Sequence, residues 1–268
     1  MSKAKRYASK INSSKKRENN IHSGRRKENK KSGIPQCQKI LLIIFIIIFI
    51  ISGVILIRWY YNASKAEEKY EELSNEVTKI ENGEETGIDF EKLKNINPDV
   101  VGWIKIDGTT IDYPIMKTTN NEYYLKKDIY NNYEQCGSIF LDYKNSPNFT
   151  DKNIVIYGHH IKKGIMFADL VKIYDGTLGN DVTVNIYTPE KTMKFKVFSS
   201  YETEPEDYSI NTNIQENEYN EFTNTLKQRS KIGFNSKFNN SNQILTLSTC
   251  DSSGQKRILV HASLEEVK

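Results

Sequence analysis

An uninterrupted apolar segment near the N-terminus constrains this chain more than any other feature. Residues 40–57, ILLIIFIIIFIISGVILI, contain no charged side chain. As a helix rising 1.5 Å per residue, this segment would be about 27 Å long, close to the thickness of the hydrocarbon core of a bilayer. One arginine and three aromatic residues follow at 58–61, and these residue types suit the membrane interface. The segment therefore predicts a transmembrane helix.

The residues before this segment indicate how it is inserted. Residues 1–39 carry thirteen Lys and Arg but only two Glu. A cleaved signal peptide is disfavoured, because the basic and apolar regions are too long and no small-residue cleavage site follows. The positive-inside rule places residues 1–39 in the cytoplasm as a disordered basic tail and the chain after Arg58 outside. We expect this tail to contact lipid head groups rather than nucleic acid.

A helical pattern follows the membrane segment. Apolar residues recur with alternating spacings of three and four, which predicts a membrane-proximal helix within residues 58–87 that ends at the glycines near 83–87. The residues of this seam are Ala63, Ala66, Tyr70, Leu73, Val77 and Ile80. Docking of the seam on the following domain is favoured over a short coiled coil, and a second short helix is expected over 89–97.

From residue 100 onward, the apolar pattern changes to the period of two that is typical of strands. Eight strands are predicted, which indicates a mainly β domain folded as a barrel or sandwich over residues 88–268. Two helices are expected between them, over 165–173 and within 214–230, the second in a connection of about forty residues between the sixth and seventh strands. The predicted strands are 100–106, 109–116, 138–142, 153–158, 181–188, 191–201, 243–250 and 256–263.

Cys250 is the candidate nucleophile, since it lies where an apolar strand ends in a polar turn. A cysteine nucleophile needs a base or a cationic neighbour, because a free thiol is mostly protonated near neutral pH. His159, which follows the strand ending at Gly158, is the candidate base and is better placed than His160. Arg257 begins the next strand, and a hairpin brings the ends of its two strands together, so Arg257 could stabilise an oxyanion.

Other interpretations of the cysteines remain open from these residues alone. Cys136 and Cys250 both lie outside the membrane and could form one disulfide, which would exclude a nucleophile. A small buried residue is the favoured interpretation of Cys136. The chain has neither a glycine-rich phosphate loop nor a paired Cys-x-x-Cys, so we expect no nucleotide, metal or other cofactor and no nucleic acid partner.

The combination of these motifs resembles the sortases, the cell-wall transpeptidases of Gram-positive bacteria. It consists of TLSTC at 246–250, an arginine seven residues later and YGHH at 157–160. NPDVVGWIKIDGTTIDYPIM at 97–116, GSIFLDYKN at 137–145 and NIVIYGHHIKKGIMFADL at 153–170 are similar to class B sortases in particular. The resemblance covers roughly residues 88–264.

The resemblance implies a closed eight-stranded barrel with N-terminal helices packed on it. It also implies that Cys250 is the nucleophile, His159 the general acid and base, and Arg257 the ligand of the oxyanion. The implied reaction cleaves a C-terminal sorting signal after a threonine, often of the Asn-Pro-x-Thr type, through a thioacyl-enzyme. An amine of a lipid-linked peptidoglycan precursor then accepts the secreted protein.

The resemblance also suggests which residues contact the substrate, and alternatives to the reaction remain. The substrate-binding candidates are Ser248, Thr249, Asn121, Leu125, Tyr208 and Ile210. The calcium-binding residues of class A sortases have no match, so no metal is expected. A membrane-anchored cysteine hydrolase would perform the same chemistry with water, and a non-enzymatic wall-binding module would use the barrel only for recognition.

Overall fold

The structure is a computed structural model that describes residues 35–268 except 82, 162, 237–241 and 251–254. The chain divides into two units, residues 1–56 and 57–268. Helix α2 (Gln36–Val77) begins in the first unit, and it is long and apolar enough to cross a membrane. The apolar side chains of residues 40–57 are largely exposed to solvent, as a lipid-facing helix requires. The predicted disordered tail lies mostly outside the described residues.

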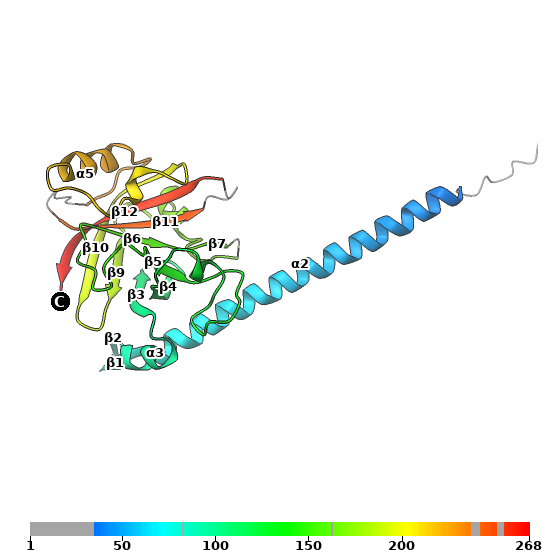
Figure 1. Cartoon of the computed structure of the whole chain (residues 1–268), viewed down its shortest axis with the longest axis horizontal. Helices are drawn as coiled ribbons and strands as arrows, with labels where there is room; N and C mark the ends of the chain where they lie inside the picture. Colours follow the sequence, from blue (N-terminus) through cyan, green and yellow to red (C-terminus); the bar gives the residue numbers. More distant parts are fainter. Residues whose placement is uncertain (1–34, 82, 162, 237–241, 251–254) are drawn as a thin grey trace, which may run out of the picture. The chain divides into compact units, whose positions relative to one another are not determined.

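The second unit is built around a closed barrel of eight strands, which confirms the predicted fold (Figure 1). The order of the strands around the barrel is β10-β12-β11-β6-β5-β4-β3-β9. Its strands are β3 (Val100–Ile106), β4 (Asp112–Met116), β5 (Ile139–Leu141), β6 (Asn153–Tyr157), β9 (Thr183–Tyr187), β10 (Thr192–Thr203), β11 (Ile244–Cys250) and β12 (Arg257–Val267).

Two of the strand pairs in the barrel are parallel. β11 runs parallel to β6, and β4 runs parallel to β5, whereas the other pairs are antiparallel. Parallel neighbours end at the same rim of a sheet. The C-terminal ends of β6 and β11, which carry the sequence candidates for base and nucleophile, therefore lie side by side.

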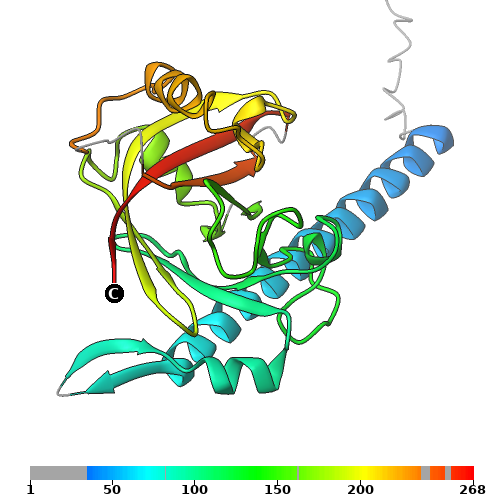
Figure 2. The ribbon, with the colours of Figure 1, turned by 60° about the vertical axis from the view of Figure 1, so that its left-hand side comes forward.

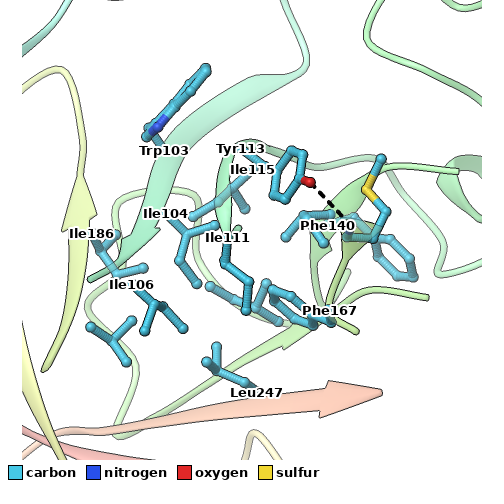
Figure 3. Close-up of a cluster of buried hydrophobic side chains, with 14 of the residues drawn as sticks. Trp103, Ile104, Ile106, Ile111, Tyr113, Ile115, Phe140, Phe167, Ile186 and Leu247 are labelled. Atoms are coloured by element: carbon cyan, nitrogen blue, oxygen red, sulfur yellow. Dashed lines mark hydrogen bonds between the residues drawn. The ribbon is translucent and has the colours of Figure 1, made fainter. Parts of the chain in front are cut away.

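The barrel interior is filled by large apolar side chains from alternating strand positions (Figure 3). Ile104, Phe167 and Leu247 are each fully buried in it, and Trp103 is fully buried on the opposite face of β3. The interior also contains a polar contact that fixes a loop, because the Tyr113 hydroxyl accepts a hydrogen bond of 3.2 Å from the Met166 backbone N–H. The period-two pattern thus predicts both the strands and the face that each turns inward.

The second half of α2 docks on the barrel through the predicted seam. Its buried residues are Ala63, Ala66, Tyr70, Leu73 and Val77. The Tyr70 ring packs edge-on against the ring of Tyr113 at 5.4 Å. Burying a Leu or Val side chain stabilises a fold by roughly 1.5–3 kcal/mol, so this seam is a substantial part of the attachment. Docking rather than a coiled coil is the arrangement in the structure.

The membrane-proximal helix is shorter than predicted, and a hairpin follows it. α2 ends at Val77, and β1 (Thr78–Glu81) pairs with β2 (Glu84–Ile88). The sequence Asn-Gly at 82–83 is a strong hairpin signal that outweighs the helical spacing. Ile80, the last predicted seam residue, is consequently 65% exposed. Helix α3 (Phe90–Ile96) matches the predicted short helix, and Asp89 caps its N-terminus.

The connections between strands differ from the sequence prediction in length. Helix α4 (Leu170–Tyr174) covers only the end of the predicted helix, because residues at its start form β8 (Ile165–Met166), which pairs with β7 (His160–Ile161). The long connection between β10 and β11 contains the 3-10 turn η3 (Tyr208–Ile210) and helix α5 (Tyr219–Gln228). Within this unit, α5 and α3 lie at opposite ends of the barrel (Figure 2).

Candidate active site

The three candidate catalytic residues meet at the rim where β6 and β11 end. Ser248 on β11 is the register partner of Tyr157 on β6, and the Gly158 N–H donates to the Ser248 carbonyl at 3.2 Å. His159 follows directly, and Cys250 ends β11 two residues after Ser248. Cys250 is in turn the register partner of Arg257, the first residue of β12. The backbone therefore places all three positions at one rim, although the Cys250 side chain lies outside the described part of the structure.

Gly158 is required here by close packing rather than by an unusual backbone angle. A Cβ at this position would lie 2.3 Å from Ile139 Cδ1 and 2.8 Å from the Phe167 ring. The Phe167 N–H also donates to the His159 carbonyl at 2.9 Å. The strand end that carries His159 thus lies directly against the barrel core, because residue 158 has no side chain.

The His159 ring is oriented by the 3-10 turn η2 (Tyr123–Leu125). Its Nε2 lies 2.9 Å from the Leu125 carbonyl oxygen. A carbonyl can only accept, so Nε2 carries a hydrogen, and in the neutral ring Nδ1 is then free to exchange a proton. Leu125 was predicted from the sequence as a substrate-binding residue, and its backbone here also holds the candidate base.

The position of η2 depends on Gly137, which the sequence analysis did not single out. Gly137 has a φ of 58°, and a Cβ there would lie 2.5 Å from the Tyr124 carbonyl oxygen and 2.7 Å from that of Leu125. The next residue, Ser138, donates its N–H to the Tyr124 carbonyl at 2.9 Å. The Leu125 carbonyl that orients His159 is therefore packed against a position where only glycine fits.

A groove of about 360 Å³ adjoins this rim and brings most of the predicted site residues together. Asn121, Leu125, His159, Ile210, Ser248 and Arg257 all line it. Phe140, Tyr157, Gly158 and Pro205 complete its lining and were not predicted. The Phe140 and Tyr157 rings lie on adjacent strands with their centroids 5.4 Å apart and are tilted by 34°, and no pattern in the sequence set them apart from core residues.

The buried carboxylate of Asp142 holds two of the groove side chains. Its Oδ2 accepts from Asn121 Nδ2 at 2.8 Å and from the Tyr157 hydroxyl at 3.0 Å. The Tyr143 N–H donates to Asn121 Oδ1 at 2.9 Å, so the orientation of the Asn121 amide is determined. Burial and the Asp142 carboxylate raise the pKa of Tyr157 well above its usual value, whereas the Arg257 charge lowers it. The phenol is therefore neutral, and the Arg257 guanidinium lies close enough for its charge to affect the pKa of Tyr157.

Two predicted substrate-binding residues do not line the groove. Thr249 is buried on the other face of β11, and its Oγ1 makes no hydrogen bond within the described part of the chain. The Tyr208 ring instead packs edge-on against Phe222 at 5.9 Å, and 47% of the residue is exposed. Their roles stay predictions that rest on the resemblance alone.

Cys136 is a free thiol, buried beside the loop that contains Glu134. Burial, with a smaller contribution from Glu134, raises the pKa of this thiol to about 12. A thiol in this state is inert, as a packing residue should be. Because Cys136 is a free thiol, the structure does not contain the alternative disulfide between Cys136 and Cys250.

No cluster suited to a metal ion occurs among the residues that the structure describes. Within these ranges, three or more His, Cys, Asp or Glu side chains never converge in an arrangement that could hold one. The chemistry available at the rim is that of a thiol, an imidazole and a guanidinium beside a partly apolar groove. Such a set of groups at one rim is suited to acyl transfer through a cysteine.

Comparison with known proteins gives the family. The family model of the sortase domain matches residues 104–265. Sortase B of Staphylococcus aureus is 31% identical over 244 residues, which cover 85% of this chain and 96% of the relative. Sortase B of Listeria monocytogenes is 40% identical over 161 residues, 59% of this chain, and this chain spans only 65% of that relative.

A solved structure agrees with these sequence matches. The structure of a Staphylococcus aureus sortase B–substrate complex superposes with a TM-score of 0.67 at 28% identity, covering 77% of this chain and 99% of that one. The chain belongs to the sortase family of cysteine transpeptidases, and within it to the sortase B group.

Proposed function

We propose that this protein cleaves the C-terminal sorting signal of secreted proteins after a threonine and transfers them to an amine of the peptidoglycan precursor. The observation that carries the proposal is the convergence of Cys250, His159 and Arg257 at one rim, beside a groove of about 360 Å³. A sortase B of Staphylococcus aureus forms a complex with a substrate, and this supports the proposal that a peptide binds in the groove of the present chain.

In the proposed first step, the Cys250 thiolate attacks the threonine carbonyl and forms a carbon–sulfur bond. The carbonyl electron pair moves to oxygen, and the Arg257 guanidinium stabilises the resulting oxyanion with hydrogen bonds. His159 Nδ1, which took the thiol proton when the Cys250 thiolate formed, gives that proton to the leaving amine as the carbonyl re-forms and the carbon–nitrogen bond breaks. A thioacyl-enzyme and the free distal fragment remain.

In the proposed second step, the precursor amine attacks the thioester carbonyl. His159 accepts the proton that the amine loses, and the carbon–sulfur bond breaks to release the Cys250 thiolate. The product is an amide between the threonine and the precursor. The hydrogen bond from His159 Nε2 to the Leu125 carbonyl keeps Nδ1 as the atom that gives and takes the proton in both steps.

The proposed topology places this reaction outside the cell. The apolar helix provides the anchor, and the basic residues 1–39 favour a cytoplasmic N-terminus. The catalytic unit would then meet both secreted proteins and the lipid-linked precursor at the outer surface of the membrane. A cysteine-reactive reagent that cannot cross membranes should label Cys250 in intact cells, and labelling only after lysis would contradict this topology.

The experiment that tests the reaction uses the full chain in detergent. A panel of peptides of the Asn-Pro-x-Thr type is incubated with the enzyme, with and without a small primary amine such as glycylglycine. The proposal predicts an amide product that appears only with the amine. A hydrolase would release the same acid product in both cases, and a wall-binding module would be unaffected by Cys250→Ala.

A further inference from the structure

The long connection between β10 and β11 forms one side of the groove through Pro205 and Ile210. In the sequence, these two residues flank Asp207. Asp207 forms an ion pair with Arg229, and Arg229 precedes the first residue of β11 by fifteen positions. Neither member of the pair lines the groove. Their contacts nevertheless determine where the groove residues lie.

The ion pair is bidentate and partly buried. Arg229 Nη1 donates to Asp207 Oδ1 at 2.9 Å, and Nη2 donates to Asp207 Oδ2 at 2.8 Å. The Asp207 side chain is only 12% exposed. The Arg229 guanidinium also lies over the Tyr201 ring, 4.1 Å from its centroid, and donates to Thr203 Oγ1 at 2.8 Å. Such a paired and stacked guanidinium is held in one orientation.

Asp207 also accepts hydrogen bonds from the turn η3 and so holds that turn in place. The Ser209 N–H donates to Asp207 Oδ1 at 3.0 Å, and the Ser209 hydroxyl donates to the same oxygen. The Thr203 hydroxyl donates to Asp207 Oδ2 at 2.6 Å. The hydrogen bonds and the Arg229 charge hold the pKa of Asp207 well below its usual range against the effect of burial, so the carboxylate stays ionised and accepts all of these bonds.

The other end of η3 is attached to the catalytic strands by a single buried side chain. Asn153 Nδ2 donates to the Ser209 carbonyl at 3.0 Å and to the Asn211 carbonyl at 2.9 Å. Asn153 is the first residue of β6, the strand that leads to His159. Its Oδ1 accepts from Thr246 Oγ1 on β11 at 2.7 Å, on the strand that leads to Cys250. One amide therefore joins η3 to both strands.

We infer that Arg229 and Asp207 are positioning residues for the peptide groove, and that they set the distance between its η3 side and the catalytic rim. This inference rests on the proposed function, because it takes the groove residues to contact the sorting signal. Loss of the bidentate pair should move Pro205 and Ile210 without moving His159, whose ring is held from η2. Peptide binding should therefore weaken, while the chemistry at the rim is unchanged.

The test compares Arg229→Lys with the wild type in the full chain. Lysine keeps the charge but cannot make the bidentate pair, and a small displacement of binding groups is costly. We expect KM for an Asn-Pro-x-Thr peptide to rise by about ten-fold while kcat stays within about two-fold. Thr203→Val, which removes one bond to Asp207, should move KM in the same direction by a smaller factor.

Two measurements separate positioning from a general loss of structure. Alkylation of Cys250 by iodoacetamide, read by peptide mass spectrometry, should proceed at the wild-type rate in Arg229→Lys. The control Asp181→Asn breaks an exposed ion pair of 2.6 Å with Lys196 and should leave KM unchanged. A wild-type KM in Arg229→Lys, or a fall in kcat and alkylation equal to the change in KM, would overturn the inference.

A binding arm keeps this inference separate from the proposed reaction. The Kd of the same peptide is measured for Cys250→Ala with and without Arg229→Lys, so no turnover is required. A ten-fold weaker Kd supports the positioning role even if the wild-type enzyme proves to be a hydrolase. An equal Kd contradicts the positioning role alone, and a peptide that binds neither protein contradicts both proposals.

Discussion

The two sides of the groove are held by different kinds of contact. On the η2 side, Leu125 is fixed by packed backbone, with Gly137 behind it, and its carbonyl touches the His159 ring. On the η3 side, the backbone bonds of a single 3-10 turn hold Ile210, and the side chains of Asp207 and Asn153 attach that turn to the rest of the unit. The first side contacts the candidate base, whereas the second contacts only the groove. Disturbing the η2 side should therefore change kcat, and disturbing the η3 side should change KM.

This difference follows from the location of each segment in the fold. η2 precedes β5 and packs against the barrel wall, where the backbone comes within van der Waals contact of Gly137. η3 lies in the long connection between β10 and β11 and, among the described residues, forms no strand ladder with its neighbours. A segment without strand partners needs side-chain hydrogen bonds to have one conformation, and an ionised carboxylate supplies several at once.

The largest expected effect is on the η2 side, at the base itself. His159→Ala should lower kcat/KM by roughly 10³-fold, because its imidazole is the proposed donor and acceptor of the proton. His160→Ala is the matched control, since His160 begins β7 and does not line the groove. Steady-state cleavage of one peptide by both variants is the measurement. Equal losses in the two variants would remove His159 from its proposed role.

A smaller effect is expected at Gly137, which packs against the carbonyl that orients the candidate base. Gly137→Ala places a methyl group against the Tyr124 and Leu125 carbonyls and should displace the acceptor of His159. A displacement of this kind should lower kcat by roughly ten- to a hundred-fold with a smaller change in KM. Gly179→Ala is the control, because Gly179 also has a positive φ of 91° but has open space around it.

The outcome for these two glycine variants distinguishes strain from displacement. Both substitutions carry the cost of a positive φ, so both should lower the melting temperature. Only Gly137→Ala should reduce turnover at a temperature where both variants are folded. If Gly179→Ala loses kcat to the same extent, backbone strain explains the result and the η2 side has no special link to the base.

The remaining prediction concerns the pH dependence of stability near the η3 side rather than turnover. His261 is fully buried, and burial lowers its pKa to about 3, with Asp207 raising it and Arg229 lowering it to lesser extents. Its Nδ1 lies 3.0 Å from Thr246 Oγ1, and its Nε2 has no partner within the described residues. Protonation of Nε2 would place an unpaired charge in the core, so the folded state resists it.

The sign of this pH dependence follows from the lowered pKa. Above pH 6.5 the histidine is neutral in both states, and stability is unaffected by its titration. Between pH 6.5 and 3 the unfolded chain binds the proton first, so the free energy of unfolding should fall as the pH is lowered through this range. Denaturant melts at several pH values give the free energy of unfolding of the wild type and of His261→Phe. Plotted against pH, this free energy should change more steeply for the wild type over this range. Parallel plots would contradict the lowered pKa of His261.

The sequence predicted the barrel and the catalytic rim because both depend on local patterns. Alternating apolar residues mark the strands, and Cys250, His159 and Arg257 were found as polar or reactive residues at strand ends. The register of parallel β6 and β11 then joins them. The strand pattern and short connections predicted a barrel or sandwich, and the resemblance to the sortases selected the closed barrel.

The residues that hold the groove had no comparable signal. Asp207, Arg229 and Asn153 are single polar residues in loops or at a strand start, and the contacts that matter here span 22 to 93 positions. Gly137 is constrained by carbonyls that only the folded chain brings near. The hairpin at 78–88 was a different failure, since the Asn-Gly signal was present but the helical spacing before it was extended too far.

In the proposed reaction, Cys250 carries the threonine carbonyl as a thioester that an amine resolves. Intact-mass spectrometry of the full chain, incubated with an Asn-Pro-x-Thr peptide, detects this thioester. We expect an adduct with the mass of the N-terminal peptide fragment on Cys250, absent in Cys250→Ala and lost as amide product when glycylglycine is added. No adduct, or an adduct whose decay and product are the same with and without the amine, would contradict the proposed reaction.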